Sequence, residues 1–337
     1  MITEITKLLL PTQTEAQTID NLSTSHVADS LRGDGADHVL AIHQNISDFI
    51  FWGFASTTII AVVLLVSVTQ KLEELFDPTL HRIKKFAPFI MQGTLGVALL
   101  LSAIFGSLFG AEVPLDAIFS GYAEIIRLVL AVTGGMLLTG ILPHLAGLVV
   151  IILFVPFIAD TGLYALNYAT HLGEAMTIFL LGGTYQIMRS NLPLIPKFYR
   201  SLELHLHKYK FMIVRIAFGI SLIFTAFYTN YLHGNAALET VTSSRIMEIF
   251  PFDPTFLVIG VLVVEILLGI FFIIGFEIRF AALTYMIFLV SSIIFFQEVV
   301  WSHTILIGAC VALFTHGYDR YTIGGSVLKR GNLEPIL

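Results

Sequence analysis

The sequence predicts an all-α, polytopic membrane protein, and three observations lead to this class. Of its 337 residues, 56% are hydrophobic and only 12% are charged. An average soluble domain carries roughly 25% charged residues. Several apolar runs approach or exceed the ~20 residues that a helix needs to cross the hydrocarbon core of a bilayer. A chain with so few charges cannot cover a water-facing surface, so the soluble classes are excluded.

The composition also excludes several kinds of site. The chain has one cysteine, Cys310, which rules out an internal disulfide framework and any metal site built from several cysteines. The formal net charge of −6 argues against binding to nucleic acid. Glycines such as Gly134 and Gly269 lie inside apolar runs, where they favour close helix packing rather than a phosphate-binding loop.

About nine transmembrane helices are expected from the apolar runs. They cover residues 48–69, 87–111, 119–142, 144–160, 163–188, 210–232, 254–276, 279–298 and 299–317. The expected organisation is an acidic head (1–47), a leading helix with its basic loop (48–86), a first four-helix unit (87–188), a basic linker (189–209), a second four-helix unit (210–320) and a tail (321–337).

Basic residues indicate the orientation in the membrane. With nine helices, all three basic clusters fall on one face of the bilayer, whereas the opposite loops are acidic. The positive-inside rule then places the C-terminus in the cytoplasm and the head outside, in a plasma membrane of prokaryotic type. The three clusters are Lys71, Arg82, Lys84 and Lys85; Arg189, Lys197, Arg200, Lys208 and Lys210; and Arg320, Lys329 and Arg330.

The chain contains an internal repeat. Gln92 to Gly96 opens the first four-helix unit as Arg215 to Gly219 opens the second, and the segment from Gly140 matches the segment from Gly275. Four is an even number of helices, so two such units enter the membrane in the same direction and are parallel repeats. We therefore expect the units to be related by a rotation of about 180° around the membrane normal.

The second unit resembles the DoxX family. The residues that carry the resemblance are Val214-Arg215-Ile-Ala-Phe-Gly219, then Glu265-Ile-Leu-Leu-Gly269, and then Gly275-Phe-Glu-Ile-Arg279-Phe-Ala-Ala282. The resemblance covers about residues 210–320, and residues 88–185 look like a degenerate second copy. It implies a four-helix membrane module and a quinone- or redox-linked membrane subunit.

Arg215, Glu265 and Arg279 are the candidate ligand or proton site. An ionisable group inside a bilayer costs at least ~2.5–3.5 kcal/mol on insertion scales, so it needs a partner or a function. We expect Arg215 to reach Glu265 and form a buried pair that lines a lipophilic pocket in the second unit. The alternative is a structural ion pair that only fixes the register of the helices. The first unit has Gln92 and Leu130 at the corresponding positions.

A weaker candidate is the pair His171 and Glu174, which the i, i+3 spacing places on one face of a helix. A histidine one turn from a glutamate occurs in metal-binding bundles, but one such pair supplies too few ligands, so no metal site is predicted. The alternative is a hydrogen-bonded polar pair inside the bundle. His171 and His303 occupy matching places in the two units, and haem ligation by both is a further alternative.

The function expected from these features is an accessory or anchor subunit of a quinone-linked redox system. Its cofactor would be a quinone, and its partners would be the lipid bilayer and either another protein or a second copy of the chain. One alternative is a non-enzymatic scaffolding subunit, and another is a transporter or lipid-handling protein. The two units differ in their intramembrane charges, which disfavours transport. Whether the chain is an enzyme stays open at this stage.

Overall fold

The computed structural model confirms the all-α class. It describes residues 52–53, 55–61, 64, 79–80, 82–181, 205–249, 253–296, 300–319 and 321–326. Within these residues the elements are helices, and the only strand-like feature is an isolated bridge between Ser107 and Pro114. The first predicted span, 48–69, is helical where it is described. The predicted head (1–47) and most of the linker (189–209) lie outside the described residues.

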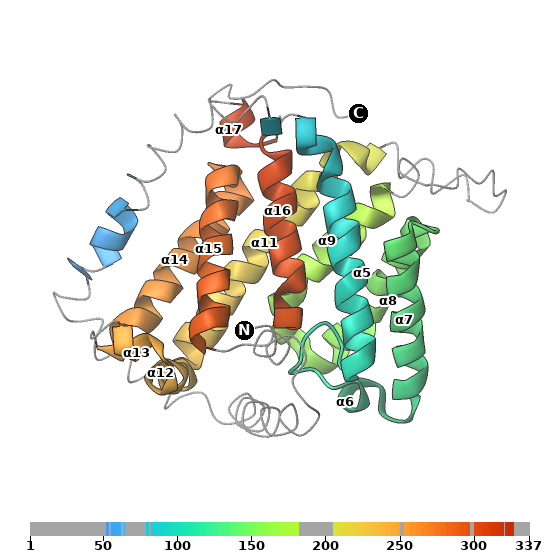
Figure 1. The fold of residues 1–337 in the computed structure, drawn as a ribbon, viewed down its shortest axis with the longest axis horizontal. Coiled ribbons are helices and arrows are strands. Elements are labelled where there is room, and N and C mark those ends of the chain that lie inside the picture. Colours follow the sequence, from blue (N-terminus) through green and yellow to red (C-terminus); the bar gives the residue numbers. More distant parts are fainter. Residues whose placement is uncertain are drawn as a thin grey trace, which may run out of the picture.

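The first unit contains four long helices that run up and down next to one another (Figure 1). The short helix α6 (Leu115–Phe119) connects the first two, and a 3-10 segment, Gly162–Tyr168, connects the last two. The four are α5 (Ala87–Phe105), α7 (Ala123–Thr139), α8 (Pro143–Thr161) and α9 (Ala169–Leu181).

The second unit also contains four long helices: α11 (Lys210–Thr225), α14 (Pro254–Ile274), α15 (Ile278–Phe296) and α16 (Thr304–His316). The π-helical segment Ala226–Leu232 extends α11, and α12 (Gly234–Ser243) and α13 (Ile246–Ile249) follow it. We call the end of the bundle with α17 (Ile323–Ser326) the upper end, and the end with α6, α12 and α13 the lower end (Figure 1).

The helix contacts of one unit have counterparts in the other. Helix α5 packs on α7 as α11 packs on α14, and α8 packs on α9 as α15 packs on α16. Between the units, α11 packs on α9 as α5 packs on α16. This reciprocal pattern is what a twofold relation between two repeats would produce. The superposition of the two units by a 180° rotation stays a prediction.

Glycine pairs let two of these helix pairs approach closely. A Cβ atom built on Gly219 would lie 2.6 Å from the carbonyl oxygen of Gly269, so α11 and α14 cross with their backbones in contact. A Cβ atom on Gly134 would likewise lie 2.8 Å from the carbonyl oxygen of Gly96 where α7 crosses α5. Such small-residue crossings are a common packing mode of membrane helices.

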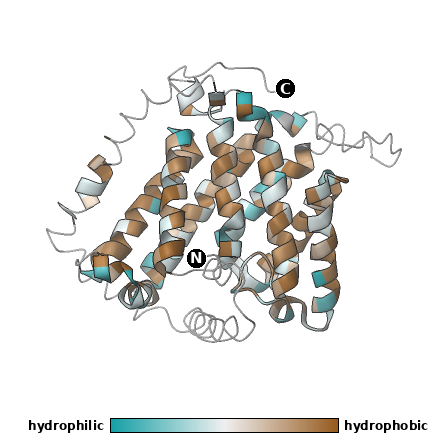
Figure 2. Ribbon diagram, in the orientation of Figure 1, coloured by the Kyte–Doolittle hydropathy of each residue, from teal (hydrophilic) through white to brown (hydrophobic). Residues whose placement is uncertain are grey.

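The apolar helices account for the membrane class. Five described helical stretches are long and apolar enough to cross a bilayer, and Figure 2 shows that hydrophobic residues dominate them. They are Lys84–Phe105, Pro143–Leu180, Lys210–Leu232, Pro254–Ile274 and Ile278–Phe296, and Val300–His316 is a shorter apolar helix. The long stretch from Pro143 contains both α8 and α9. The total of nine spans stays a prediction.

The predicted end of the second span differs from the observed one for a local reason. Helix α5 ends at Phe105 rather than at 111, because Gly106 adopts a left-handed conformation (φ 70°) that ends the helix. Pro156 does not end the fourth predicted span, since it lies inside α8, which continues to Thr161. Membrane helices tolerate an internal proline because neighbouring groups satisfy the freed backbone carbonyl.

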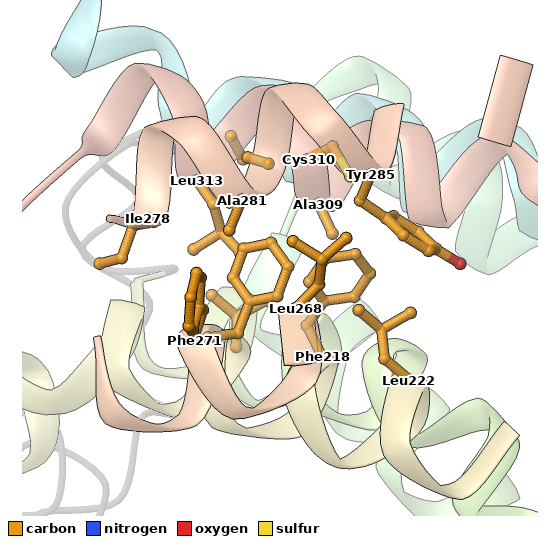
Figure 3. Close-up of a cluster of buried hydrophobic side chains, with 14 of the residues drawn as sticks. Phe218, Leu222, Leu268, Phe271, Ile278, Ala281, Tyr285, Ala309, Cys310 and Leu313 are labelled. Atoms are coloured by element: carbon orange, nitrogen blue, oxygen red, sulfur yellow. The ribbon is translucent and has the colours of Figure 1, made fainter. Parts of the chain in front are cut away.

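The interior of the second unit is a close-packed apolar cluster. Figure 3 shows Phe218 and Leu222 of α11 meeting Leu268 and Phe271 of α14, with residues of α15 and α16 closing the cluster. Phe218 and Leu268 are fully buried. This packing holds the polar side chains of the unit at fixed depths.

Charge distribution supports the predicted orientation. Lys84 and Lys85 precede α5 and Lys208 precedes α11, so these basic residues gather at the upper end. Acidic residues gather at the lower end. Glu112 and Asp116 follow α5 there, Asp160 lies near the lower end of α8, and Glu239 lies in α12. The upper end is therefore the candidate cytoplasmic face.

We predict that a green fluorescent protein fused after Leu337 fluoresces, because the positive-inside rule places the C-terminus in the cytoplasm, where this reporter folds. An alkaline phosphatase fused at the same position should be inactive, since that enzyme needs an extracytoplasmic location. Comparing the two fusions at equal expression measures the orientation. An active phosphatase fusion with a dark fluorescent fusion would contradict it.

Candidate functional site

The second unit encloses a cavity of about 300 Å³ near its lower end. Its walls come from the end of α11, the π-helical segment, α12, α14, α15 and the start of α16. The apolar part of the wall includes Val258, Val261, Phe288, Leu289, Phe296 and Leu306. Polar side chains also line the cavity, among them Thr225, Thr229, Asn230, Glu265, Ser292 and His303.

Glu265 is the buried acid of this cavity. It is the twelfth of 21 residues in α14, so it lies near the middle of the helix, and only 6% of it is exposed. The side-chain amide Nδ2 of Asn230 donates a hydrogen bond of 3.2 Å to Glu265 Oε2. Asn230 is itself buried, and it projects from the π-helical segment. π-Helical turns occur frequently at functional sites.

An apolar cavity with a few convergent polar groups is the usual form of a small-molecule site. Here Glu265 can accept hydrogen bonds or carry a proton, and Asn230 can donate or accept one. The hydroxyl groups of Tyr285 and Ser292 also border the cavity. The site therefore suits the polar head of a lipophilic molecule. The described residues contain no group of three or more potential metal ligands.

The predicted direct contact between Arg215 and Glu265 is wrong. Arg215 Nη2 donates to the carbonyl oxygen of Tyr321 at 3.1 Å, and Nη1 and Nε have no hydrogen-bond partner among the described residues. The two side chains lie on opposite sides of the Gly219–Gly269 crossing, each one turn away from it. At 1.5 Å per residue, this places them roughly 12 Å apart along the helix axis.

Arg215 and Arg279 belong to a second polar cluster, at the upper end. The guanidinium of Arg215 lies beside Gly275, and that of Arg279 lies beside Gly317. These glycines follow the last residues of α14 and α16, so each arginine lies where the helix dipole is negative. Arg279 also lies over the ring of Tyr318, whose hydroxyl donates to Glu277. The three candidate residues therefore divide between two sites, and only Glu265 lines the cavity.

Asp319 connects this upper cluster. Its Oδ2 lies 3.8 Å from His316 Nε2, and its Oδ1 accepts the backbone N–H of Tyr321 at 2.7 Å. Burial alone would raise the pKa of Asp319. His316, the Tyr321 N–H and the charge of Arg215 together outweigh burial and hold this pKa below its ordinary value.

His171 and Glu174 are both buried in the first unit, as expected of an interior pair. The expected hydrogen bond between them is not formed. Neither ring nitrogen of His171 and neither carboxyl oxygen of Glu174 has a hydrogen-bond partner among the described residues. The ring of His171 instead lies against the rings of Phe109 and Tyr168, 5.2 and 5.4 Å away between centroids.

The two histidines considered as haem ligands face different sites. His171 is enclosed by aromatic rings of the first unit, whereas His303 lines the Glu265 cavity of the second. An axial pair needs both imidazoles on one haem. The different surroundings of His171 and His303 therefore disfavour haem ligation by both.

Sequence reasoning missed Asn230 and Asp319. Asn230 stands beside Thr229 inside the apolar run 210–232, and this polar pair is a signal that the sequence offers. Asp319 follows the last span and reads as an ordinary boundary residue. Its role depends on the return of the chain onto the ends of α11 and α14, which the local sequence does not indicate.

The comparisons with known proteins concern the second unit. The DoxX family model matches residues 211–298, which confirms the resemblance there. The matched segment contains every residue that lines the cavity except His303 and Leu306. No curated protein and no solved structure shows a significant match to the chain.

We predict that Asp319→Asn lowers the free energy of unfolding at neutral pH by about 1–3 kcal/mol, because it leaves buried hydrogen-bonding groups without a charged partner. Since the folded-state pKa of Asp319 is lowered, its stabilising contribution is present above the ordinary aspartate pKa. The contribution is lost as the pH falls through the lowered pKa. Unfolding measured over a pH series in detergent should therefore show the two proteins converging in acid.

The control for this series is Asp116→Asn, since Asp116 is exposed at the lower end of the molecule. It should track the parent protein at every pH. A difference between Asp319→Asn and the parent that stays constant down to strongly acidic pH would contradict the assignment.

Proposed function

We propose that the protein is a membrane-embedded subunit of a quinone-linked redox system that holds a quinone-type head group in the Glu265 cavity. The observation that carries the proposal is the position of a buried carboxyl group in the wall of a 300 Å³ cavity between apolar helices. The coincidence of this cavity with the DoxX match supports it. A protein partner or a second copy of the chain completes the proposed system.

The cavity offers each part of such a molecule a suitable surface. Quinone oxygens accept hydrogen bonds, and Asn230, Tyr285 and Ser292 carry donor groups in the wall. Glu265 can hold a proton next to the head group, because Asn230 fixes its carboxyl group in position. The isoprenoid or alkyl tail would lie against the valine and phenylalanine side chains. Electrons would come from a redox partner.

Helix α12 forms one side of the cavity. Ala237 and Val241 line the wall and are buried, while Glu239 and Ser243 are exposed. The helix is therefore amphipathic, and in the proposed orientation it lies at the extracytoplasmic end of the molecule. In this proposal the ligand enters from the lipid near α12, and the plasma membrane is the site of action.

We predict that Glu265→Leu weakens the binding of decylubiquinone by about tenfold, because the protonated carboxyl group of the proposal donates a hydrogen bond to a quinone oxygen, and its loss leaves a buried polar group without a partner at a cost of ~1–3 kcal/mol. The measurement is the dissociation constant in detergent-solubilised protein, obtained by titration calorimetry. Glu239→Leu is the matched control, since Glu239 lies on the exposed face of α12. It should bind as the parent does.

Two results would contradict the proposal. One is quinone binding that is unchanged by Glu265→Leu in a folded protein. The other is a parent protein that binds no quinone but retains a stoichiometric protein partner, which would favour the scaffolding alternative.

A further inference from the structure

The first unit has a different interior at the place that corresponds to the Glu265 cavity. Aligning Gly140 with Gly275 pairs Leu130 with Glu265, and Leu130 is fully buried. The same alignment pairs Phe154 and Phe157 of α8 with the cavity residues Leu289 and Ser292 of α15. Phe154 and Phe157 are buried in the first unit, so this region is filled.

The side chain of Phe109, from the loop between α5 and α6, fills this region of the first unit. Between α5 and α6 the chain turns back on itself, with Leu108 N–H donating to Val113 O at 2.7 Å. This turn carries Phe109 into the unit, where only 2% of the residue is exposed. Phe109 has φ 64°, a left-handed conformation that bulky residues rarely adopt. The fold thus holds the Phe109 ring inside the unit despite a cost to the backbone.

Rings from two helices and the segment between them surround Phe109. Its centroid lies 4.5 Å from that of Phe154 in a stacked arrangement and 5.7 Å from that of Phe157 in an edge-on arrangement. The rings of His171 and Tyr168 lie 5.2 and 6.4 Å away. These distances fall in the range of favourable aromatic contacts. The surroundings are therefore shaped to a flat six-membered ring.

The polar groups of the surroundings do not match a phenylalanine. The backbone of Phe109 lies near the imidazole of His171, yet neither ring nitrogen has a partner in hydrogen-bond geometry. The hydroxyl group of Ser107, two residues before Phe109 in the same turn, also lacks a partner among the described residues. A buried polar group without a partner is costly, and native structures contain few of them. A ring with a hydroxyl or carbonyl substituent would suit this environment better.

We infer that the first unit contains a second ring-binding site, which the chain occupies with Phe109 and which accepts phenol-type rings when that side chain is removed. The inference stands on the contacts of the first unit, so it does not require the Glu265 cavity to bind a quinone. His171 is the residue that would give the site its preference for a polar ring. Phe109 then acts as a tethered occupant that closes the site.

The test measures the binding of 4-fluorophenol and fluorobenzene to the full-length protein by fluorine NMR. Phe109→Ala should bind one more molecule of 4-fluorophenol than the parent does. Apolar cavities left by such truncations bind small aromatic molecules. At this additional site 4-fluorophenol should bind about tenfold more tightly than fluorobenzene, a ratio expected of one hydrogen bond. Adding His171→Leu should remove that preference.

Phe89→Ala is the control, because Phe89 is an exposed phenylalanine of α5, and it should gain no site. If Phe109→Ala does not fold, Phe109→Gly leaves the whole ring space open and suits the positive φ of 64° at this position, and 4-fluorophenol should then raise its melting temperature but not that of Phe89→Gly. A folded Phe109 variant that gains no site would overturn the inference. Equal binding of both probes, or a preference that survives His171→Leu, would overturn it as well.

Discussion

The structure depends on the backbone contact between α11 and α14 at Gly219 and Gly269. A side chain at either glycine would meet the other helix within 3 Å, so the two helices have one register. That register sets the depth of every polar group on them. Arg215 lies one turn above the crossing and faces the upper end, and Glu265 lies one turn below it and faces the cavity. The crossing thus separates a cation from an acid that an apolar environment would otherwise drive together.

Each of the two separated groups then needs its own hydrogen-bond partners, because an unsatisfied polar group in hydrocarbon costs several kcal/mol. Arg215 donates to the Tyr321 carbonyl and lies near Asp319, and the arginine groups lie against helix C-termini. Glu265 accepts a hydrogen bond from the side-chain amide of Asn230, which lies in the π-helical segment. The contacts of Arg215 at the upper end hold the chain after α16 against the bundle. The hydrogen bond from Asn230 leaves Glu265 at the edge of the cavity, and such a polar group in an apolar wall is what the binding of a ligand head group requires.

The fold class could be predicted because it rests on local properties. Apolar runs indicate helices, and Gly106, Gly140 and Gly275 end helices through their left-handed conformations. The DoxX resemblance likewise came from short motifs around Arg215, Glu265 and Gly275. Depth along one helix could be counted, but the register between two antiparallel helices could not. The predicted Arg215–Glu265 contact is wrong for this reason. The length of the arginine side chain alone would allow the contact, but the crossing point of α11 and α14 places the two residues on opposite sides of it.

Other features depended on contacts between distant segments. Nothing near Phe109 in the sequence predicts a left-handed phenylalanine that points into a bundle, and the rings that surround it come from α8 and α9. Leu142 and Glu277 share a left-handed conformation two residues after Gly140 and Gly275. That shared turn strengthens the case for two related units. The sequence repeat located the turn, but the conformation became visible only in three dimensions.

The central claim is that the crossing places Arg215 and Glu265 in separate sites, and a pair of double-mutant cycles tests it most directly. The cycles combine Arg215→Met with Glu265→Gln, and Asn230→Ala with Glu265→Gln, with free energies of unfolding measured in detergent. The account predicts that the first pair is additive within about 0.5 kcal/mol, whereas the second shows a coupling energy of about 0.5–3 kcal/mol. A coupling energy between Arg215 and Glu265 as large as that between Asn230 and Glu265 would contradict it.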